Sequence, residues 1–156
     1  MFNILIIIIT IILVILMVIM LICKISIEKD KKKGILFKSK DLVYIKGYDD
    51  LLEEQGERVI LTLHFKKIVF EFENKKYKKE YRLSSIKEVK HYTKEELVNA
   101  INNKEVKIGK NFNKKLLSWK KYIIFTIKED KEETILYGSS LPELISGTIE
   151  KAKKQI

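Results

Sequence analysis

The chain has 156 residues and a formal net charge of +10, and every charged side chain lies from Lys24 onward. This length leaves room for one globular domain after the uncharged start. The excess of positive charge favours anionic partners such as acidic lipid, acidic protein surfaces or nucleic acid. Among the 31 basic residues only Arg58 and Arg82 are arginine. Because arginine makes the two-point contacts that read phosphates and bases, this composition argues against specific nucleic-acid recognition.

The single cysteine, Cys23, excludes a disulfide within the chain. The two histidines, His64 and His91, have no cysteine or histidine at the spacing of a structural zinc site. We therefore expect no metal and no cofactor.

Residues 1–23 predict a transmembrane helix. They carry no charged side chain, and only Asn3 and Thr10 interrupt a run of large apolar residues. As a helix this segment would be roughly 33 Å long, which is enough to cross a bilayer. A cleaved signal peptide would have a positive start, a shorter apolar run and small residues at its cleavage site, and this segment has none of them. We expect an anchor that stays attached.

Lipid attachment at Cys23 is an alternative form of anchoring. Residues 20–23 are similar to a bacterial lipidation signal, but Ile22 stands where that signal needs a small residue. The transmembrane helix is therefore the preferred prediction.

Positive charge follows the predicted span, and only the terminal amine precedes it. This asymmetry predicts a single-pass protein of the cell membrane whose C-terminal domain lies in the cytoplasm. We expect residues 24–33 to form a charged juxtamembrane linker of net charge +3, in which each lysine near an anionic leaflet would contribute about 1 kcal/mol. A plain stop-transfer flank explains the same charges equally well. The expected membrane-surface contacts are Lys24, Lys29, Lys31, Lys32 and Lys33.

The remainder, residues 34–156, is expected to form one mostly β domain. Apolar residues alternate with polar ones in the runs 59–65 and 68–73, which predict a hairpin turning at Lys66 and Lys67. An acidic loop over residues 49–57 separates this hairpin from an earlier strand. The first five strands are predicted over residues 42–48, 59–65, 68–73, 77–83 and 87–92.

A short helix follows the fifth strand. Thr93 and Glu96 match a capping box, and Asn102-Asn103 marks the expected end of the helix. The lysine-rich residues 104–118 predict an irregular loop. Two further strands, over residues 119–128 and 133–138, form a second predicted hairpin.

The chain closes with a helix predicted over residues 141–154, capped by Ser140 and Glu143 and carrying Pro142 in its first turn. Its apolar stripe would cover an open end or edge of the sheet. The stripe comprises Leu141, Leu144, Ile145, Thr148, Ile149 and Ala152, and the expected core joins Leu61, Leu63, Phe65, Phe70 and Phe72 to Ile123, Phe125, Leu144, Ile145 and Ile149.

Three stretches resemble bacterial pleckstrin-homology-like (PH-like) and GRAM-like domains. They are GERVILTLHFKKIVFEF (56–72), YRLSSIKEVKHYT (81–93) and YIIFTIKEDKEETILYGSSLPELISGTIEKAKK (122–154). The resemblance implies a mainly β, α+β fold: a seven-stranded bent barrel or sandwich with a C-terminal capping helix. It also implies binding of lipid headgroups, peptides or other proteins, and no enzymatic activity.

The chain departs from this family at the first loop of the domain. Phosphoinositide-binding members carry a basic cluster between their first two strands, whereas residues 49–57 here hold five carboxylates, which would repel a phosphorylated headgroup. The basic run 75–79 interleaves lysines with Tyr77, as single-strand nucleic-acid binders do, but Tyr77 also fits the buried side of its strand. Expected partner or lipid contacts are Asp49, Asp50, Glu53, Glu54, Lys75, Lys76, Lys78 and Lys79.

No set of residues predicts catalysis. The serine pairs 84–85 and 139–140 lack the G-x-S-x-G turn of a hydrolase nucleophile, and no phosphate-binding glycine motif occurs. Glu71 and Glu73 share a strand face, but they are expected to face outward among lysines.

The sequence thus leads to three hypotheses. The first is a non-enzymatic, membrane-anchored PH-like adaptor or accessory subunit at the cytoplasmic face, with the lipid bilayer and a membrane-associated protein as its partners. The alternative is a domain that senses anionic lipid through lysines outside the usual headgroup pocket. The third is a membrane-bound nucleic-acid binder, whose affinity would fall steeply with salt.

Overall fold

The computed structural model describes residues 2–48, 55–74, 77–106, 108 and 117–155, with the backbone alone for residues 2–7 and Lys31. It divides into two compact units, Met1–Leu36 and Phe37–Ile156. The predicted acidic residues 49–54 and the basic pair Lys75 and Lys76 lie outside the described residues.

The first unit is dominated by one helix, α1 (Phe2–Lys32). Its segment Ile8–Asp30 is long and apolar enough to cross a membrane, and none of that segment is buried by the rest of the protein. The helix continues through the charged residues expected to form a linker and ends before Gly34, whose φ of +67° suits a glycine. Lysine, glutamate and isoleucine do not interrupt a helix, so charge alone does not end it.

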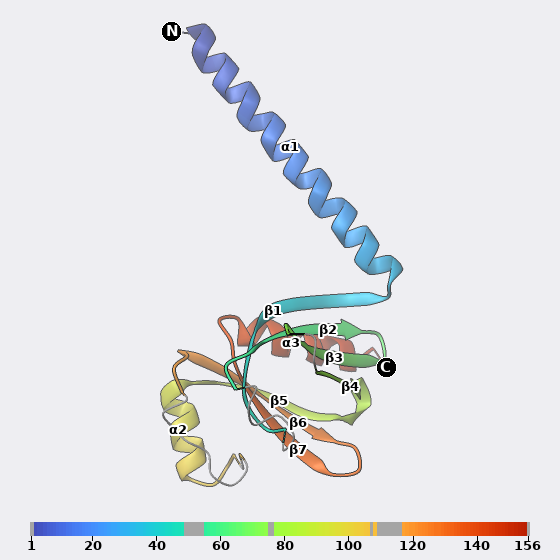
Figure 1. Ribbon diagram of the computed structural model, residues 1–156, viewed down its shortest axis with the longest axis vertical. Coiled ribbons are helices and arrows are strands. Elements are labelled where there is room, and N and C mark those ends of the chain that lie inside the picture. Colours follow the sequence, from blue (N-terminus) through green and yellow to red (C-terminus); the bar gives the residue numbers. More distant parts are fainter. Residues whose placement is uncertain (1, 49–54, 75–76, 107, 109–116, 156) are drawn as a thin grey trace. The chain divides into compact units, whose positions relative to one another are not determined.

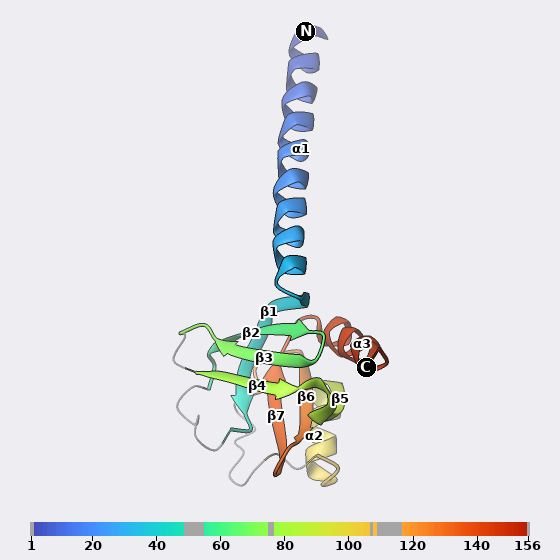
Figure 2. The ribbon, with the colours of Figure 1, turned by 90° about the vertical axis from the view of Figure 1, so that its right-hand side faces the viewer.

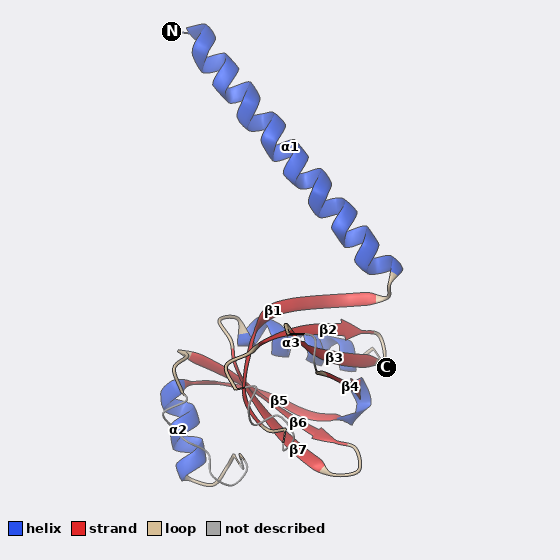
Figure 3. Cartoon of the chain, viewed as in Figure 1, coloured by secondary structure: helices blue, strands red, loops and turns tan. Residues whose placement is uncertain are grey.

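The second unit contains seven strands and two helices. The chain order, given by residue bounds, is β1 (Ile35–Lys46), β2 (Arg58–His64), β3 (Lys67–Phe72), β4 (Lys78–Arg82), β5 (Ile86–Thr93), α2 (Lys94–Asn102), β6 (Lys121–Lys128), β7 (Glu132–Gly138) and α3 (Pro142–Lys153), with a short 3-10 helix, η2 (Leu83–Ser85), between β4 and β5. Figure 3 shows the strands and helices by type. The predicted mainly β, α+β class with a C-terminal helix is confirmed.

All seven strands belong to one antiparallel sheet of order β4-β3-β2-β1-β7-β6-β5. β1 is longer than predicted and joins the two halves of the sheet, because it passes from beside β2 to beside β7 (Figure 1). A bulge between Tyr44 and Lys46 interrupts the pairing of β1 with β7. Gly47 follows the bulge with a φ of +139°, and an added Cβ would lie only 2.5 Å from the Cα of Ile135. Only glycine fits this position.

The main core lies inside the folded sheet. Phe70 on β3 packs edge to face on Phe125 of β6 and stacks on Tyr137 of β7, with ring centroids 5.1 and 5.4 Å apart. Since β3 is not a neighbour of β6 or β7, these contacts cross the interior and show that the sheet bends over on itself. Ile145 and Ile149 of α3 close this core.

A second, smaller core lies on the opposite face of β6. The alternation of β6 places Ile123 and Phe125 in the main core and Tyr122 and Ile124 in the second. Leu97 of α2 covers this outer side. Both faces of β6 are therefore buried, which explains its continuous apolar run.

The predicted capping box of α2 is confirmed. The Thr93 hydroxyl accepts a hydrogen bond from the Glu96 N–H at 3.3 Å, and the Glu96 carboxylate accepts one from the Thr93 N–H at 2.7 Å. The helix ends at Asn102, as expected.

The predicted capping box of α3 is wrong. The N-cap position is Leu141, and no side chain of the helix itself caps it. Asp41 of β1 takes this role instead: its carboxylate accepts hydrogen bonds from the Ser140 and Leu141 N–H groups at 2.8 and 3.0 Å and from the Ser140 hydroxyl. Glu143 pairs with Lys121 at 2.6 Å and so is not available as a capping residue.

Two residues predicted to lie in the core are exposed. Phe65 forms the β2–β3 turn with Lys66, one residue earlier than predicted, and the turn breaks the strand alternation. Leu144 lies outside the buried row of α3, which is set by Ile145, Ile149 and Ala152 at helical spacing. Leu141 is exposed as well. The remaining predicted core residues are buried.

Candidate functional site

The predicted membrane-surface lysines lie at the C-terminal end of α1 and just beyond it. Lys24, Lys29, Lys31 and Lys32 belong to the helix, and Lys33 follows it. The described side chains among these residues are largely exposed to solvent. The structure thus supplies a cationic helix end.

The described part of the predicted basic run packs against the end of the main core. Tyr77 packs edge to face on Phe72, as its alternation indicated, with ring centroids 6.2 Å apart. The Lys79 ammonium lies 5.3 Å from the ring centroid of Tyr48, within the range of a cation–π contact. Lys78 lies 3.9 Å from Glu80. Lys79 therefore supports the fold as well as presenting charge, whereas the exposed ion pair of Lys78 contributes little to stability.

Buried tyrosines lie beneath this end of the sheet. The hydroxyls of Tyr48 and Tyr137 are 3.1 Å apart, and the Tyr44 hydroxyl accepts a hydrogen bond from the Tyr48 N–H at 2.9 Å. Burial raises the pKa of both Tyr48 and Tyr137 well above the usual value. Neutral, mutually hydrogen-bonded hydroxyls explain how these polar groups can lie in an apolar core.

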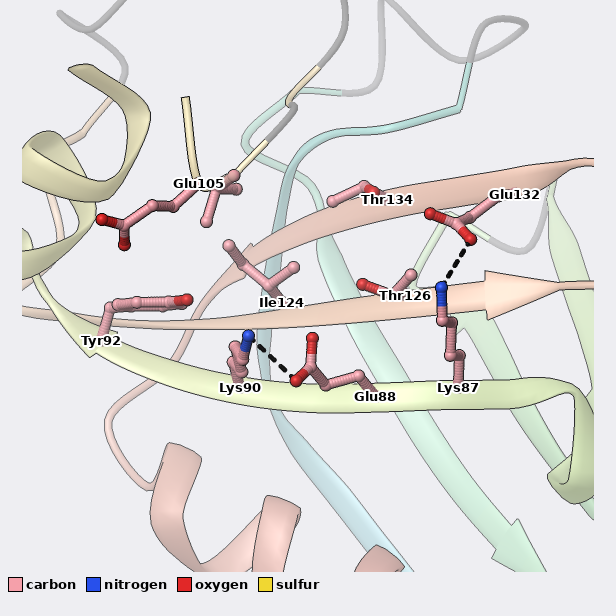
Figure 4. Close-up of a pocket in the computed structure, with 10 residues that line it drawn as sticks. Lys87, Glu88, Lys90, Tyr92, Glu105, Ile124, Thr126, Glu132 and Thr134 are labelled. Carbon is pink, nitrogen blue, oxygen red and sulfur yellow. Dashed lines mark hydrogen bonds and ion pairs between the residues drawn. The ribbon is translucent and has the colours of Figure 1, made fainter. Parts of the chain in front are cut away.

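A groove on the outer face of the second half of the sheet brings together polar side chains from three strands and from the segment after α2 (Figure 4). β5 presents Glu88, Lys90 and Tyr92 to it at alternate positions, and Lys87 joins them at an irregularity between Ile86 and Glu88. β6 and β7 supply its floor, and the residues after α2 form one wall. The lining residues are Lys87, Glu88, Lys90, Tyr92, Glu105, Val106, Ile124, Thr126, Glu132 and Thr134.

The charges of the groove are paired. The Lys87 ammonium lies 3.0 Å from the Glu132 carboxylate, and the Lys90 ammonium lies 2.9 Å from Glu88. The hydrogen bond that Lys90 donates to Glu88 raises the pKa of Lys90. With Glu105 added, the groove holds three carboxylates and two ammonium groups. This excess of negative charge disfavours a phosphorylated ligand.

The size of the groove limits what it can bind. Its volume is about 220 Å³, below the roughly 300–1,000 Å³ of sites that enclose small molecules. Between the charged pairs lie the two hydroxyls of Thr126 and Thr134 and the aliphatic Ile124. Such a surface offers hydrogen bonds and charges of both signs to one or two side chains of a protein partner.

The histidines and serines form hydrogen bonds of a structural kind. His91 Nδ1 lies 3.3 Å from the Ser146 hydroxyl at the contact between β5 and α3. Ser139 donates its hydroxyl to Asp41 at 2.6 Å. Within the part of the chain that the structure describes, no cluster of three or more His, Cys, Asp or Glu side chains is arranged to hold a metal ion.

The groove was not among the predicted sites. The sequence indicates that Glu88, Lys90 and Tyr92 share one strand face, because they alternate along β5. It does not give the register that places Lys90 opposite Ile124 and Glu88 opposite Thr126. The predicted contacts at residues 49–54 and 75–76 lie outside the described residues.

No protein-family model matches this chain, and no curated protein is significantly similar to it.

Proposed function

We propose that the protein is a single-pass, membrane-anchored PH-like interaction module without enzymatic activity, which holds a protein partner at the cytoplasmic face of the cell membrane. α1 is the anchor, and the charge that follows it favours a cytoplasmic domain. The observation that carries the proposal is the small groove of paired charges, because it favours protein side chains over a phosphorylated headgroup.

The arrangement of the domain supports the PH-like assignment. Seven antiparallel strands followed by one helix that packs on the main core are what the sequence resemblance implies. α2 is an addition between β5 and β6, and Glu105 and Val106, which follow it, form one wall of the groove. We propose that this addition adapts a common scaffold to a particular partner.

The composition of the acidic loop also favours a protein partner. Residues 49–57, which follow β1, hold five carboxylates, and these would repel a phosphorylated headgroup.

Capture from membranes tests the proposed function. Full-length protein with Lys87→Glu and Lys90→Glu reverses both cations of the groove, and we expect it to lose a partner that the wild type retains. Lys94→Glu with Lys104→Glu makes the same change of charge on exposed residues outside the groove and serves as the control. Equal recovery of the partner by both variants would place the binding surface elsewhere.

Anionic-lipid sensing is the second candidate, favoured by exposed lysines outside the groove. A protein spanning residues 34–156 should bind vesicles of equal surface charge equally, whether phosphatidylserine or a phosphoinositide supplies the charge. The reason is that unspecific lysine attraction responds to charge and is screened within about 8 Å at physiological salt. Micromolar binding selective for one headgroup would promote lipid sensing over the adaptor role.

A further inference from the structure

The β2–β3 turn carries an exposed aromatic side chain on a rigid support. Phe65 is 50% exposed, one of only a few large apolar side chains that are exposed in the described part of the second unit. The carbonyl of Lys66 accepts a hydrogen bond from the Leu83 N–H at 2.9 Å, and Lys67 pairs with Glu80 at 2.6 Å. The turn is therefore fixed against η2 and β4, and the exposure of Phe65 is a property of the folded domain.

This turn lies at the end of the domain where the anchor enters. Tyr44 near the end of β1 bonds to Gly56 and Glu57 just before β2, so the antiparallel β2 must run back toward the start of β1. Figure 2 shows the β2–β3 turn at the opposite end of the strand pair from the β3–β4 connection. The Phe65 turn therefore lies beside the first residues of β1.

Chain length keeps this end of the domain near the membrane in any orientation of the two units. Phe37, where the second unit begins, follows the last helical residue, Lys32, by five residues, which span at most about 18 Å when fully extended. Neighbouring strands are separated by about 5 Å. Lys32 itself lies nine helical residues, or about 14 Å, beyond Cys23, where the predicted span ends. The turn is thus tethered at a distance from which it can reach the bilayer surface.

The surroundings of Phe65 carry positive charge. Lys66 is exposed in the turn itself, and the C-terminal end of α3, with exposed Lys151 and Lys154, lies beside the turn in both views (Figures 1 and 2). An exposed aromatic ring flanked by lysines matches an anionic membrane surface, since the ring enters the interface and the ammonium groups contact lipid phosphates.

We propose that the β2–β3 turn is a second membrane contact, in which Phe65 enters the interface and Lys66, Lys151 and Lys154 contact anionic lipid of the membrane that holds α1. This inference rests on the proposed anchoring. It adds an orientation: the Phe65 end of the domain faces the bilayer, and the opposite end of β2 and β3, which carries Glu73, faces the cytoplasm.

Measuring how deeply a nitroxide label on the full-length protein enters the bilayer tests this contact. In a Cys23→Ser background, a nitroxide is attached at Phe65→Cys or, as the matched position at the other end of the strands, at Glu73→Cys. The protein is placed in nanodiscs of phosphatidylcholine with or without phosphatidylglycerol. We expect the label at position 65 to become accessible to oxygen and shielded from an aqueous nickel complex when phosphatidylglycerol is present, while the label at position 73 stays aqueous.

Reversing the charge of the proposed lipid-contacting lysines is the second part of this experiment. Lys66→Glu, Lys151→Glu and Lys154→Glu together should weaken the contact by about fivefold for each lysine and return the label at position 65 to water. The same reversal at Lys94, Lys104 and Lys120 should leave it in the lipid. A label at position 65 that stays aqueous in a correctly inserted protein overturns the contact alone. Protein recovered outside the nanodiscs overturns the anchoring, and with it this contact.

Discussion

Phe70 and Phe125 pack edge to face with ring centroids 5.1 Å apart, although three strands separate β3 from β6 in the sheet. This contact joins the two halves of the bent sheet through its interior. Both rings are fully buried, and Tyr137 packs against each of them. The stability of the domain should therefore depend strongly on this aromatic cluster.

Phe70→Ala is expected to lower the free energy of unfolding by about 3 to 5 kcal/mol, because it removes a buried ring and leaves a cavity between the two halves of the sheet. Denaturant unfolding of residues 34–156 measures this loss. Phe65→Ala is the control, since its ring is half exposed, and it should change stability by less than about 1 kcal/mol. Similar losses in the two variants would contradict the described core.

Local apolar patterns were enough to predict β2, β3, β6 and β7, because a strand buried on one face alternates and a strand buried on both faces is continuously apolar, and either pattern shows in a few consecutive residues. They failed at Phe65, where a two-residue turn ends the alternation one position early. They also could not predict the cap of α3. Asp41 lies 99 residues before Ser140, and only the pairing of β1 with β7 brings the two together. The groove was missed for the same reason, since strand register is not a local property.

Asp41→Asn should destabilise the domain by about 1 to 2 kcal/mol at neutral pH, because it weakens the cap of α3. Partial burial acts to raise the pKa of Asp41, but hydrogen bonds from Ser139, Ser140 and Leu141 outweigh it and hold this pKa below the usual 3.8. The stabilisation is therefore fully present above pH 3.8 and is lost as the pH falls through the lower, folded-state value.

Unfolding measured from neutral pH downward checks this cap. The difference in stability between the wild type and Asp41→Asn should shrink as the wild-type carboxylate becomes protonated. The exposed Asp130→Asn serves as the control for the loss of one surface charge. A difference that does not change with pH would mean that the Asp41 charge does not stabilise α3.

Gly47 and Gly147 form a matched pair for alanine substitution. Gly47→Ala should cost more than about 1 kcal/mol, because it has a φ of +139° and its added Cβ would meet the Ile135 backbone at 2.5 Å. Gly147→Ala adds a Cβ in open space on α3 and should stabilise the domain by about 0.5 to 1 kcal/mol. Thermal unfolding distinguishes the two effects by sign, and a destabilised Gly147→Ala would show that the exposed face of α3 is wrongly described.

The charge asymmetry around α1 predicts on which side of the membrane the C-terminal domain lies. A reporter fused after Ile156 should be active only in the cytoplasm. Replacing Lys31, Lys32 and Lys33 with glutamate should reduce the cytoplasmic fraction, since it removes most of the positive charge that follows the span. Activity of the unmodified fusion on the outer side would refute the proposed orientation.

Photo-crosslinking from the floor of the groove tests the adaptor function most directly. A photoreactive amino acid at Thr126 of the full-length protein, irradiated in intact cells, should give a discrete protein adduct that disappears when Lys87 and Lys90 are both changed to glutamate. The same probe at the exposed Ser84, outside the groove, should not give that adduct. An adduct from Ser84 but none from Thr126, or an adduct from Thr126 that survives the charge reversal, would contradict protein recognition by this groove.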